Sequence, residues 1–264
     1  MTESDQIPVD LGAGDALVVG ASRGLGLALA QALASGSEAA TPPTRLFVTH
    51  RGIEVPEQLA DLVDGAAIPV IPLSLDVSDD AALAEFSTAL RTREAKLLAT
   101  VHAAGILHES GVRPEKSLTQ LKRSALQRVF DINAFAPLLL AQAVLPLTPR
   151  QAPTHFAALS AMVGSIGDNR IGGWYAYRAS KSALNQLLKT LAIEGRRTHP
   201  GLCVTSIHPG TTDTDLSKPF QGNVPEGKLY TPAQSAARIL RVVCAGRPEN
   251  SGRFMNWNGQ ALPW

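Results

Sequence analysis

The segment Tyr175-Ala176-Tyr177-Arg178-Ala179-Ser180-Lys181 contains a phenol and an ammonium group at a spacing that would let them move a proton together. Residues four positions apart on a helix lie on the same face, so Tyr177 and Lys181 can be neighbours. Tyr175 cannot reach Lys181, because six residues place it elsewhere around the helix. A nearby cation lowers the pKa of a phenol from its ordinary value of about 10, which suits proton transfer to a carbonyl or from an alcohol. Any exposed helix can produce such a pair by chance, so the chemistry needs support from other motifs.

A second motif, Gly20-Ala21-Ser22-Arg23-Gly24-Leu25-Gly26, follows a predicted strand and opens a predicted helix. Glycines at this point permit a tight turn and close approach of a ligand, and the helix N-terminus offers free N–H groups to a pyrophosphate. The spacing is GxxxGxG, whereas GxGxxG is commoner. The order of strand, glycine loop and helix favours dinucleotide binding over a purely structural turn.

The ends of the next two strands indicate which dinucleotide is bound. An NAD-specific site would place a carboxylate at the end of the second strand, but Arg51 stands there. Arg51, helped by Arg23, could bind a 2′-phosphate, which favours NADP(H) over NAD(H); the alternative is that both arginines are simply solvated. Asp76, followed by Val77, could accept a hydrogen bond from the adenine amino group or could be an ordinary helix N-cap.

Composition and charge argue against several other classes of protein. The formal net charge is +1, with acidic and basic residues interspersed, which is not typical of a protein that binds nucleic acid or an anionic membrane. The longest apolar run, residues 138–147, is too short to span a bilayer, and the first fifteen residues include four acids and no basic residue, unlike a signal peptide. Cys203 and Cys244 stand far apart without metal-ligand spacing, so we expect no metal site. We expect a cytoplasmic protein with a small-molecule partner.

The elements that must position these motifs alternate between strands and helices. Apolar runs rich in β-branched residues predict strands at 16–19, 45–50, 71–75, 97–103, 154–160, 202–208 and 253–257. Helical patterns occupy 25–34, 56–63, 81–93, 118–147, 174–197 and 232–243. Such alternation predicts an α/β fold: a doubly wound parallel sheet of about seven strands, with helices on both faces and a single domain at 13–264. We expect residues 1–12 to be flexible, and the loop at about 211–230 to be a substrate lid.

Together the motifs resemble those of the classical short-chain dehydrogenase/reductase family over essentially the whole chain. The resemblance rests on GASRGLG, LDV, HAAG (102–105), Asn133 in a long helix, YRASK and HPGTTDT (208–214). Residues 164–181 are most similar to C-factor and sniffer-type carbonyl reductases. The resemblance implies a Rossmann-type fold with NAD(P) at the C-terminal edge of the sheet and 4-pro-S hydride transfer.

The resemblance also implies a role for individual residues. Tyr177 would be the acid/base, Lys181 would bind the nicotinamide ribose and lower the tyrosine pKa, and Asn133 would hold a water in a proton relay. The motifs and the resemblance together give the expected cofactor-binding residues: Gly20, Ser22, Arg23, Gly24, Leu25, Gly26, Arg51, Asp76, Val77, Ala103, Ala104, Gly105, Tyr177, Lys181, Pro209, Gly210, Thr212 and Thr214.

Two positions depart from the family pattern. His102 and Ala103 replace the two asparagines of the usual Asn-Asn-Ala-Gly, and Ala161 stands where the family carries its catalytic serine. Successive strand residues point to opposite faces, so Ser160 could replace that serine only if a bulge or an early strand end turned it inward. Ser165 is the other candidate, and a site without any serine is the third possibility. We expect Ser160.

Three functions compete on this evidence. The first is an NADPH-dependent reductase of a ketone or aldehyde, reversible as an alcohol dehydrogenase. The second is a dinucleotide-binding regulatory or signalling protein with weak or no catalysis, which Ala161 and His102 would explain. The third, a sugar epimerase or dehydratase, fits least well because no sizeable C-terminal substrate domain follows the sheet. The long helices resemble those through which the family dimerises, so we expect a homodimer or homotetramer.

Overall fold

The central sheet contains seven parallel strands. The structure is a computed structural model that describes residues 9–11, 14–35 and 40–264. The strands follow the spatial order β11-β8-β7-β6-β2-β4-β5. Their bounds are β2 (Asp15–Val19), β4 (Arg45–His50), β5 (Val70–Ser74), β6 (Leu97–His102), β7 (Thr154–Leu159), β8 (Leu202–His208) and β11 (Arg253–Asn256). This sheet confirms the predicted doubly wound α/β fold, and the reversal of strand order between β2 and β6 creates a switch point where such folds bind ligands.

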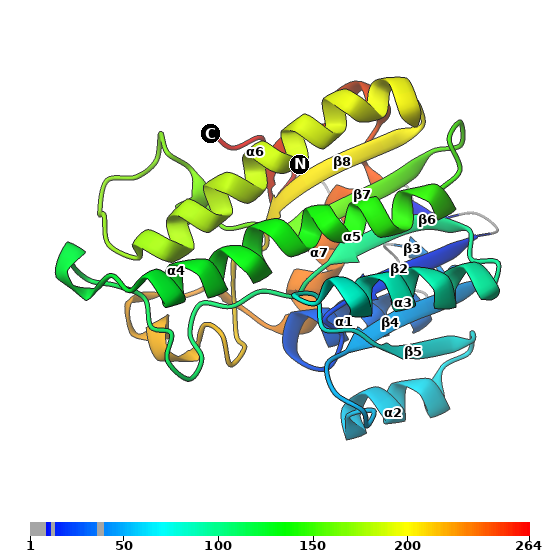
Figure 1. The fold of residues 1–264 in the computed structure, drawn as a ribbon, viewed down its shortest axis with the longest axis horizontal. Coiled ribbons are helices and arrows are strands. Elements are labelled where there is room, and N and C mark those ends of the chain that lie inside the picture. Colours follow the sequence, from blue (N-terminus) through cyan, green and yellow to red (C-terminus); the bar gives the residue numbers. More distant parts are fainter. Residues whose placement is uncertain (1–8, 12–13, 36–39) are drawn as a thin grey trace.

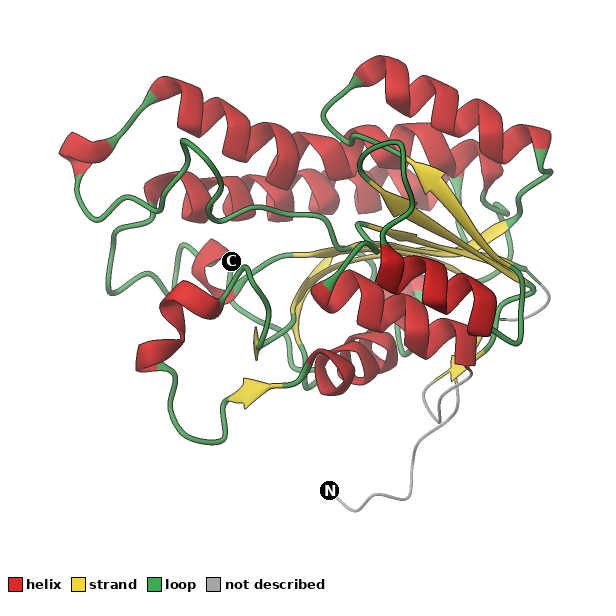
Figure 2. Ribbon diagram, turned by 90° about the horizontal axis from the view of Figure 1, so that it is seen from below, coloured by secondary structure: helices red, strands yellow, loops and turns green. Residues whose placement is uncertain are grey.

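Helices cover both faces of the sheet, as Figures 1 and 2 show. On one face lie α1 (Gly24–Ser35), α2 (Glu57–Gly65) and α7 (Pro232–Cys244), which share a buried apolar core with alternate strand residues such as Val18 and Ile207. On the other face lie α3 (Asp80–Thr92), α5 (Ala136–Val144) and α6 (Tyr175–Thr198), which pack on the intervening residues, among them Val19 and Ala158. The period of two along each strand therefore decides which helix layer a side chain meets.

The predicted helix 118–147 is divided into several pieces, so that prediction was wrong in its bounds. A 3₁₀ turn, η1 (Leu118–Gln120), precedes α4 (Arg123–Phe130), and a π-helical turn, η2 (Asp131–Phe135), joins α4 to α5 before a last 3₁₀ turn, η3 (Leu145–Leu147). Pro137 explains the π turn, because proline has no N–H for the carbonyl four residues earlier, that of Asn133.

The helical run from Arg123 to Leu147 is long and apolar enough to cross a bilayer by length and composition alone. The apolar run at 138–147, which is too short by itself to span a bilayer, is only a part of this longer helical run. Half of its most apolar window is buried inside the protein, and a single helix of this kind is weak evidence for a membrane span.

Two small strand pairs lie outside the main sheet. β1 (Val9–Asp10) pairs with β3 (Ala40–Thr41), and Leu11 is buried in the core; these three residues belong to the segment that we expect to be flexible. Residues 1–8 and 12 of that segment lie outside the described part. β9 (Thr211–Thr212) pairs with β10 (Leu229–Tyr230) and closes the base of the predicted lid. The lid contains the 3₁₀ segment η5 (Lys218–Asn223); the remaining 3₁₀ turns are η4 (Met162–Gly164) and η6 (Pro248–Asn250).

Candidate active site

Tyr177 and Lys181 lie one turn apart near the start of α6, on the face that covers the sheet. Lys181 is buried, and its Nζ donates a hydrogen bond to the carbonyl of Leu159 at 2.7 Å. The same Nζ lies 5.8 Å from the centroid of the Tyr177 ring. The lysine is therefore anchored to the end of β7, and the half-buried tyrosine stands beside it. Tyr175 is exposed at the first position of the helix.

The electrostatics of this pair differ from what we predicted. Burial raises the pKa of the Tyr177 phenol to about 12 and lowers the pKa of the Lys181 ammonium to about 7. The predicted lowering of the tyrosine pKa is wrong for the protein chain itself, because the loss of hydration disfavours the phenolate more than the neighbouring amine favours it. The phenol is protonated over the whole physiological range.

Asn133 lies in the π turn and is fully buried. Its Oδ1 accepts a hydrogen bond from the backbone N–H of Ile106, and its Nδ2 donates to the Ile106 carbonyl, both at 2.8 Å. A Cβ atom placed on Gly105 would lie 3.2 Å from Asn133 Oδ1 and 3.5 Å from Lys181 Nζ. The end of β6 therefore brings the asparagine and the lysine to the same point.

Ser160 follows β7, which ends at Leu159 and so meets one of the two conditions for the serine to turn inward. Leu159, its neighbour in sequence, accepts the hydrogen bond from Lys181 Nζ through its carbonyl, so Ser160 stands at the strand end that holds the lysine. Its hydroxyl is buried, and no hydrogen-bond partner is found for it among the described residues. Ser160 thus offers a hydroxyl without a partner next to the residue that anchors Lys181.

Ser165, the other candidate serine, uses its hydroxyl elsewhere. It donates a hydrogen bond to the backbone carbonyl of Trp264 at 3.2 Å and accepts one from the N–H of Asp168 at 3.1 Å. These bonds stabilise the turn after η4 against the last residue of the chain.

His102 lies at the end of β6, where the family carries an asparagine. It is buried, and burial lowers its pKa to about 3, with a further contribution from the charge on Lys181. Its register partner in β7 is Ala158, so the imidazole lies on the same face as the tyrosine and the lysine. The imidazole is therefore uncharged at neutral pH. It lies close enough to Lys181 to feel its charge, but it forms no ion pair with it.

The glycine loop lies between the end of β2 and the start of α1. Gly20 has a φ of +85°, which favours glycine, and its N–H donates to the Thr49 hydroxyl at 3.0 Å. A Cβ atom on Gly26 would collide with the carbonyl of Gly20, so a larger residue cannot occupy that position. Ser22 and Leu25 are half-buried in the same turn. This loop can cradle a diphosphate against the N–H groups at the start of α1.

Other predicted cofactor contacts surround the loop. A Cβ atom on Gly20 would lie 2.8 Å from the backbone nitrogen of Ala104, and one on Gly24 would lie 3.3 Å from Thr214 Cγ2. Ala103 is half-buried beside Ala104. The ends of β2 and β6 and the start of the lid therefore converge on the glycine loop.

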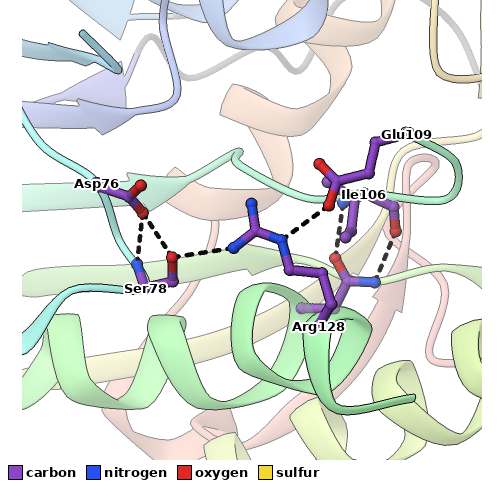
Figure 3. A network of polar contacts seen from close by, with 6 residues as sticks. Asp76, Ser78, Ile106, Glu109 and Arg128 are labelled. Atoms are coloured by element: carbon purple, nitrogen blue, oxygen red, sulfur yellow. Dashed lines mark hydrogen bonds and ion pairs between the residues drawn. The ribbon is translucent and has the colours of Figure 1, made fainter. Parts of the chain in front are cut away.

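Figure 3 shows a polar network near the end of β5. Asp76 Oδ1 accepts hydrogen bonds from the Ser78 N–H at 2.9 Å and the Ser78 hydroxyl at 2.7 Å, and Arg128 links Ser78 to Glu109. The bonds from Ser78 hold the pKa of the Asp76 carboxyl below its ordinary value, with smaller contributions from the cations Arg128 and Arg51.

The sequence left two roles open for Asp76: an acceptor for the adenine amino group, or the N-cap of a helix. Asp79 caps α3, so Asp76 is not that helix's N-cap. Val77, which follows Asp76, is buried. The Asp76 carboxylate therefore remains available as a hydrogen-bond acceptor at the sheet edge.

The two arginines that we predicted for a 2′-phosphate are both exposed. Arg51 lies just after β4 and is near enough to Asp76 to influence its pKa. Arg23 lies in the glycine loop and pairs with Asp215 of the lid at 3.3 Å, both side chains being about three-quarters exposed to solvent. Such an exposed pair contributes little to stability, so Arg23 can exchange its partner.

The segment after β8 leads from the sheet edge into the lid. Pro209 and Gly210 are half-buried, and the buried Thr212 hydroxyl bonds to the Ser235 hydroxyl of α7 at 2.7 Å. The Thr212 side chain is therefore engaged with α7, and its carbonyl accepts hydrogen bonds from the Ser217 and Thr214 hydroxyls of the lid.

The lid packs over the tyrosine through aromatic rings. Phe220 lies edge-on to Trp174 at a centroid distance of 4.9 Å, and Trp174 lies edge-on to Tyr177 at 6.2 Å. His108 contacts the other side of Phe220 at 5.8 Å. These rings form an apolar wall beside the phenol.

Two residues of this region received no role from the sequence. Thr49 holds the glycine loop through its hydroxyl and its carbonyl. Ser180 accepts a hydrogen bond from Asn133 Nδ2 at 3.2 Å and donates one to the Tyr177 carbonyl at 2.8 Å. Its place in the YRASK motif, three residues after the tyrosine, was the signal that could have identified it.

Comparison with known proteins agrees with this geometry. A sequence model of the family described as short chain dehydrogenase matches residues 15–224. Over 205 residues the chain is 34% identical to 1-hydroxy-2-glutathionyl-2-methyl-3-butene dehydrogenase from Rhodococcus sp. (strain AD45), covering 78% of this chain and 84% of the relative. Over 139 residues it is 35% identical to the C-signal protein of Myxococcus xanthus, covering 53% and 78% of the two chains.

Solved structures share the whole fold. The carbonyl reductase Sniffer of D. melanogaster superposes with a TM-score of 0.82 at 27% identity, covering 96% of this chain and all of that chain. An NADPH-bound carbonyl reductase from chicken fatty liver gives a TM-score of 0.81 at 27% identity, covering 96% and 94%. Fold, motifs and relatives agree over most of the chain, and the protein therefore belongs to the short-chain dehydrogenase family of oxidoreductases.

Proposed function

We propose that the protein is an NADPH-dependent reductase that converts a ketone or aldehyde to an alcohol and catalyses the reverse oxidation as well. The observation that carries the proposal is the convergence of Tyr177, Lys181 and Asn133 at the ends of β6 and β7, on the same edge of the sheet as the glycine loop. A proton donor and a dinucleotide cradle at one edge of a sheet are the two components that carbonyl reduction requires.

NADP(H) is the favoured cofactor. The glycine loop and the start of α1 would hold its diphosphate, and the exposed guanidinium groups of Arg51 and Arg23 would hold its 2′-phosphate. No carboxylate competes at the end of β4, where an NAD-specific site would place one. The similar reductase from chicken fatty liver contains NADPH.

In the proposed mechanism, bound NADPH supplies the hydride and the chain's own residues supply the proton. Tyr177 donates its phenolic proton to the carbonyl oxygen of the substrate. A phenol with a pKa of about 12 is protonated at neutral pH, yet it is a stronger acid than the alcohol that forms, so the transfer is favourable. Lys181 would bind the nicotinamide ribose and Ser160 would donate a hydrogen bond to the substrate oxygen.

The direct test compares the wild type with Tyr177→Phe for NADPH consumption over a panel of ketones and aldehydes. We expect the variant to bind NADPH normally and to lose at least about 100-fold in kcat, because general acid catalysis contributes that much or more. Tyr175→Phe is the matched control, since Tyr175 is exposed on another side of the same helix turn. Equal turnover by the wild type and Tyr177→Phe would exclude this mechanism.

A regulatory or signalling role is the second candidate. Ala161 and His102, where the family carries a serine and an asparagine, favour it, and one relative is the C-signal protein of Myxococcus xanthus. Tight NADPH binding without turnover across a broad carbonyl panel would support this role. Turnover that depends on Tyr177 would rule it out.

We further propose a symmetric oligomer in the cytoplasm. Phe135, Leu139 and Ile193 are exposed apolar residues on the α4–α5 run and on α6, the helices expected to form the interface. Phe135 also lines a surface cavity of about 520 Å³ with Leu126 and Phe130. Sedimentation of the wild type and of Phe135→Glu would test the interface: we expect the charge to produce monomers.

A further inference from the structure

Glu115 is a buried carboxylate in the segment between β6 and α4, yet its partners lie at the start of α6. Its side chain is only 3% exposed. Glu115 Oε2 accepts a hydrogen bond from the N–H of Ala176 at 3.2 Å, and the Glu115 carbonyl accepts one from the N–H of Trp174 at 2.5 Å. A carboxylate removed from water is costly in free energy unless it is hydrogen-bonded, so its position needs an explanation.

The start of α6 lacks the cap that a helix usually supplies for itself. The N-cap residue, Trp174, has no side-chain oxygen, and the first turn contains no acidic residue. In most helices a Ser, Thr, Asp or Asn at the N-cap accepts a hydrogen bond from the second or third helical N–H. Ala176 is the second helical residue, so Glu115 provides this bond from 61 residues away. Its negative charge also suits the positive end of the helix dipole.

Trp174 itself adopts a conformation that a bulky residue seldom takes. Its φ and ψ are 52° and 43°, in the left-handed region, and such conformations persist only where the surrounding structure imposes them. The ring that this conformation orients stands between Tyr177 and the lid residue Phe220. Glu115 therefore holds two backbone N–H groups at the start of α6, that of Trp174 and that of Ala176.

We propose that Glu115 is a positioning residue for the carbonyl reduction proposed above. By capping α6 at Ala176 it holds the first helical turn in place, and with that turn the Tyr177 phenol and the Trp174 ring. Displacing a reacting group by about 1 Å can cost on the order of 100-fold in rate, so a loosened first turn reduces turnover even where the cofactor still binds. The proposal rests on the assigned role of Tyr177.

The test compares Glu115→Ala with Glu115→Gln. The amide oxygen of glutamine keeps the acceptor for Ala176, whereas alanine removes it. We expect Glu115→Ala to lower kcat for carbonyl reduction by roughly 10-fold to 100-fold, with the Kd for NADPH within about threefold of the wild type. We expect Glu115→Gln to keep kcat within about threefold. Wild-type kcat in Glu115→Ala, or equal loss in both variants, would overturn the proposal.

Asp79→Ala is the matched control, because Asp79 caps α3 through the N–H groups of Ala81 and Ala82. Both alanine variants lose one helix cap, so each should lower Tm by about 2–4 °C. Only Glu115→Ala should lower kcat. An equal kcat loss in Asp79→Ala would show that the loss of any helix cap lowers kcat through stability, and it would overturn the positioning role of Glu115. If Glu115→Ala does not fold, Glu115→Asp replaces it, since the shorter side chain keeps the charge and withdraws the acceptor.

Hydrogen exchange at Ala176 provides a readout that does not depend on turnover. We expect this amide to exchange faster in Glu115→Ala than in the wild type and in Glu115→Gln. Unchanged exchange would refute the cap itself. Full turnover by Tyr177→Phe would instead refute the proposed function, and the two failures are therefore distinguishable.

Discussion

At the scale of single residues, the identity of the catalytic hydroxyl depends on which way Ser160 faces. The family serine is replaced by Ala161, but Ser160 follows Leu159, whose carbonyl anchors Lys181, and its buried hydroxyl has no partner among the described residues. Ser165 already bonds to Trp264 and Asp168. These contacts favour Ser160 as the donor to the substrate oxygen.

We predict that Ser160→Ala lowers kcat by roughly 100-fold to 1,000-fold, the usual cost of losing one oxyanion donor. Ser165→Ala is the matched control, and we expect its kcat to stay within about threefold of the wild type even if its Tm falls. Steady-state kinetics with saturating NADPH measure both. A larger kcat loss in Ser165→Ala than in Ser160→Ala would reverse the assignment.

Arg51 is the residue that we expect to select the cofactor. Arg51→Asp removes a phosphate partner and supplies an acceptor for a ribose 2′-OH, so the ratio of kcat/KM for NADPH to that for NADH should fall roughly 10-fold to 100-fold, as expected for a hydrogen bond to a charged group. Arg150→Asp makes the same charge change at an exposed site just before β7, at the opposite sheet edge. An unchanged ratio in Arg51→Asp would show that another residue recognises the phosphate.

At the scale of elements, the lid is anchored at its base by α7. The guanidinium of Arg238 lies 4.0 Å from the Tyr230 ring centroid and 4.2 Å from that of Trp257, so it contacts both rings, which lie edge-on to each other at 5.1 Å. The buried bond between Thr212 and Ser235 attaches the other end of the lid to the same helix. These two contacts therefore hold both ends of the segment 212–230 against the same helix.

We predict that Arg238→Ala loosens the lid, because partly desolvated cation–π contacts contribute about 1–2 kcal/mol. Trypsin should then cleave after the exposed Lys228, which Leu229 follows, on the order of 10-fold faster, since 1.4 kcal/mol corresponds to a factor of ten. Arg241→Ala is the control: it removes an exposed arginine from the same helix. Equal cleavage rates in the two variants would show that Arg238 does not anchor the lid.

At the scale of the whole molecule, three histidines make the fold sensitive to acid. Burial lowers the pKa of His102 to about 3 and those of His155 and His208 to about 4. Below pH 6.5 the unfolded chain binds protons at these residues and the folded protein does not, so stability falls as the pH drops. The loss is about 1.4 kcal/mol per pH unit for each histidine between its folded and unfolded pKa values.

We predict that His155→Gln makes the stability of the fold less dependent on pH. The free energy of unfolding, measured in urea between pH 4.5 and 5.5, should fall about 1.4 kcal/mol per pH unit less steeply in the variant than in the wild type. An identical slope in the two proteins would show that His155 does not carry this sensitivity.

Much of the fold follows from local patterns. The seven strands of the sheet lie within one residue of their predicted ends, because an apolar run between turn residues is visible in the sequence itself. The helix predicted at 118–147 was wrong at its start: a separate 3₁₀ turn, η1, precedes the helical run that begins at Arg123, and apolar periodicity does not show this break. The pairing of Val9 and Asp10 with β3 was also missed, since two residues are too short to form a pattern.

The sequence by itself determined the order of elements, the glycine loop and the proximity of Tyr177 to Lys181, because each depends on residues a few positions apart. Only the tertiary structure decided that burial raises the tyrosine pKa, that the Leu159 carbonyl beside Ser160 anchors Lys181, and that Glu115 caps α6. Desolvation and hydrogen bonds between distant segments depend on which surfaces meet when the chain folds, and no local pattern of residues encodes them.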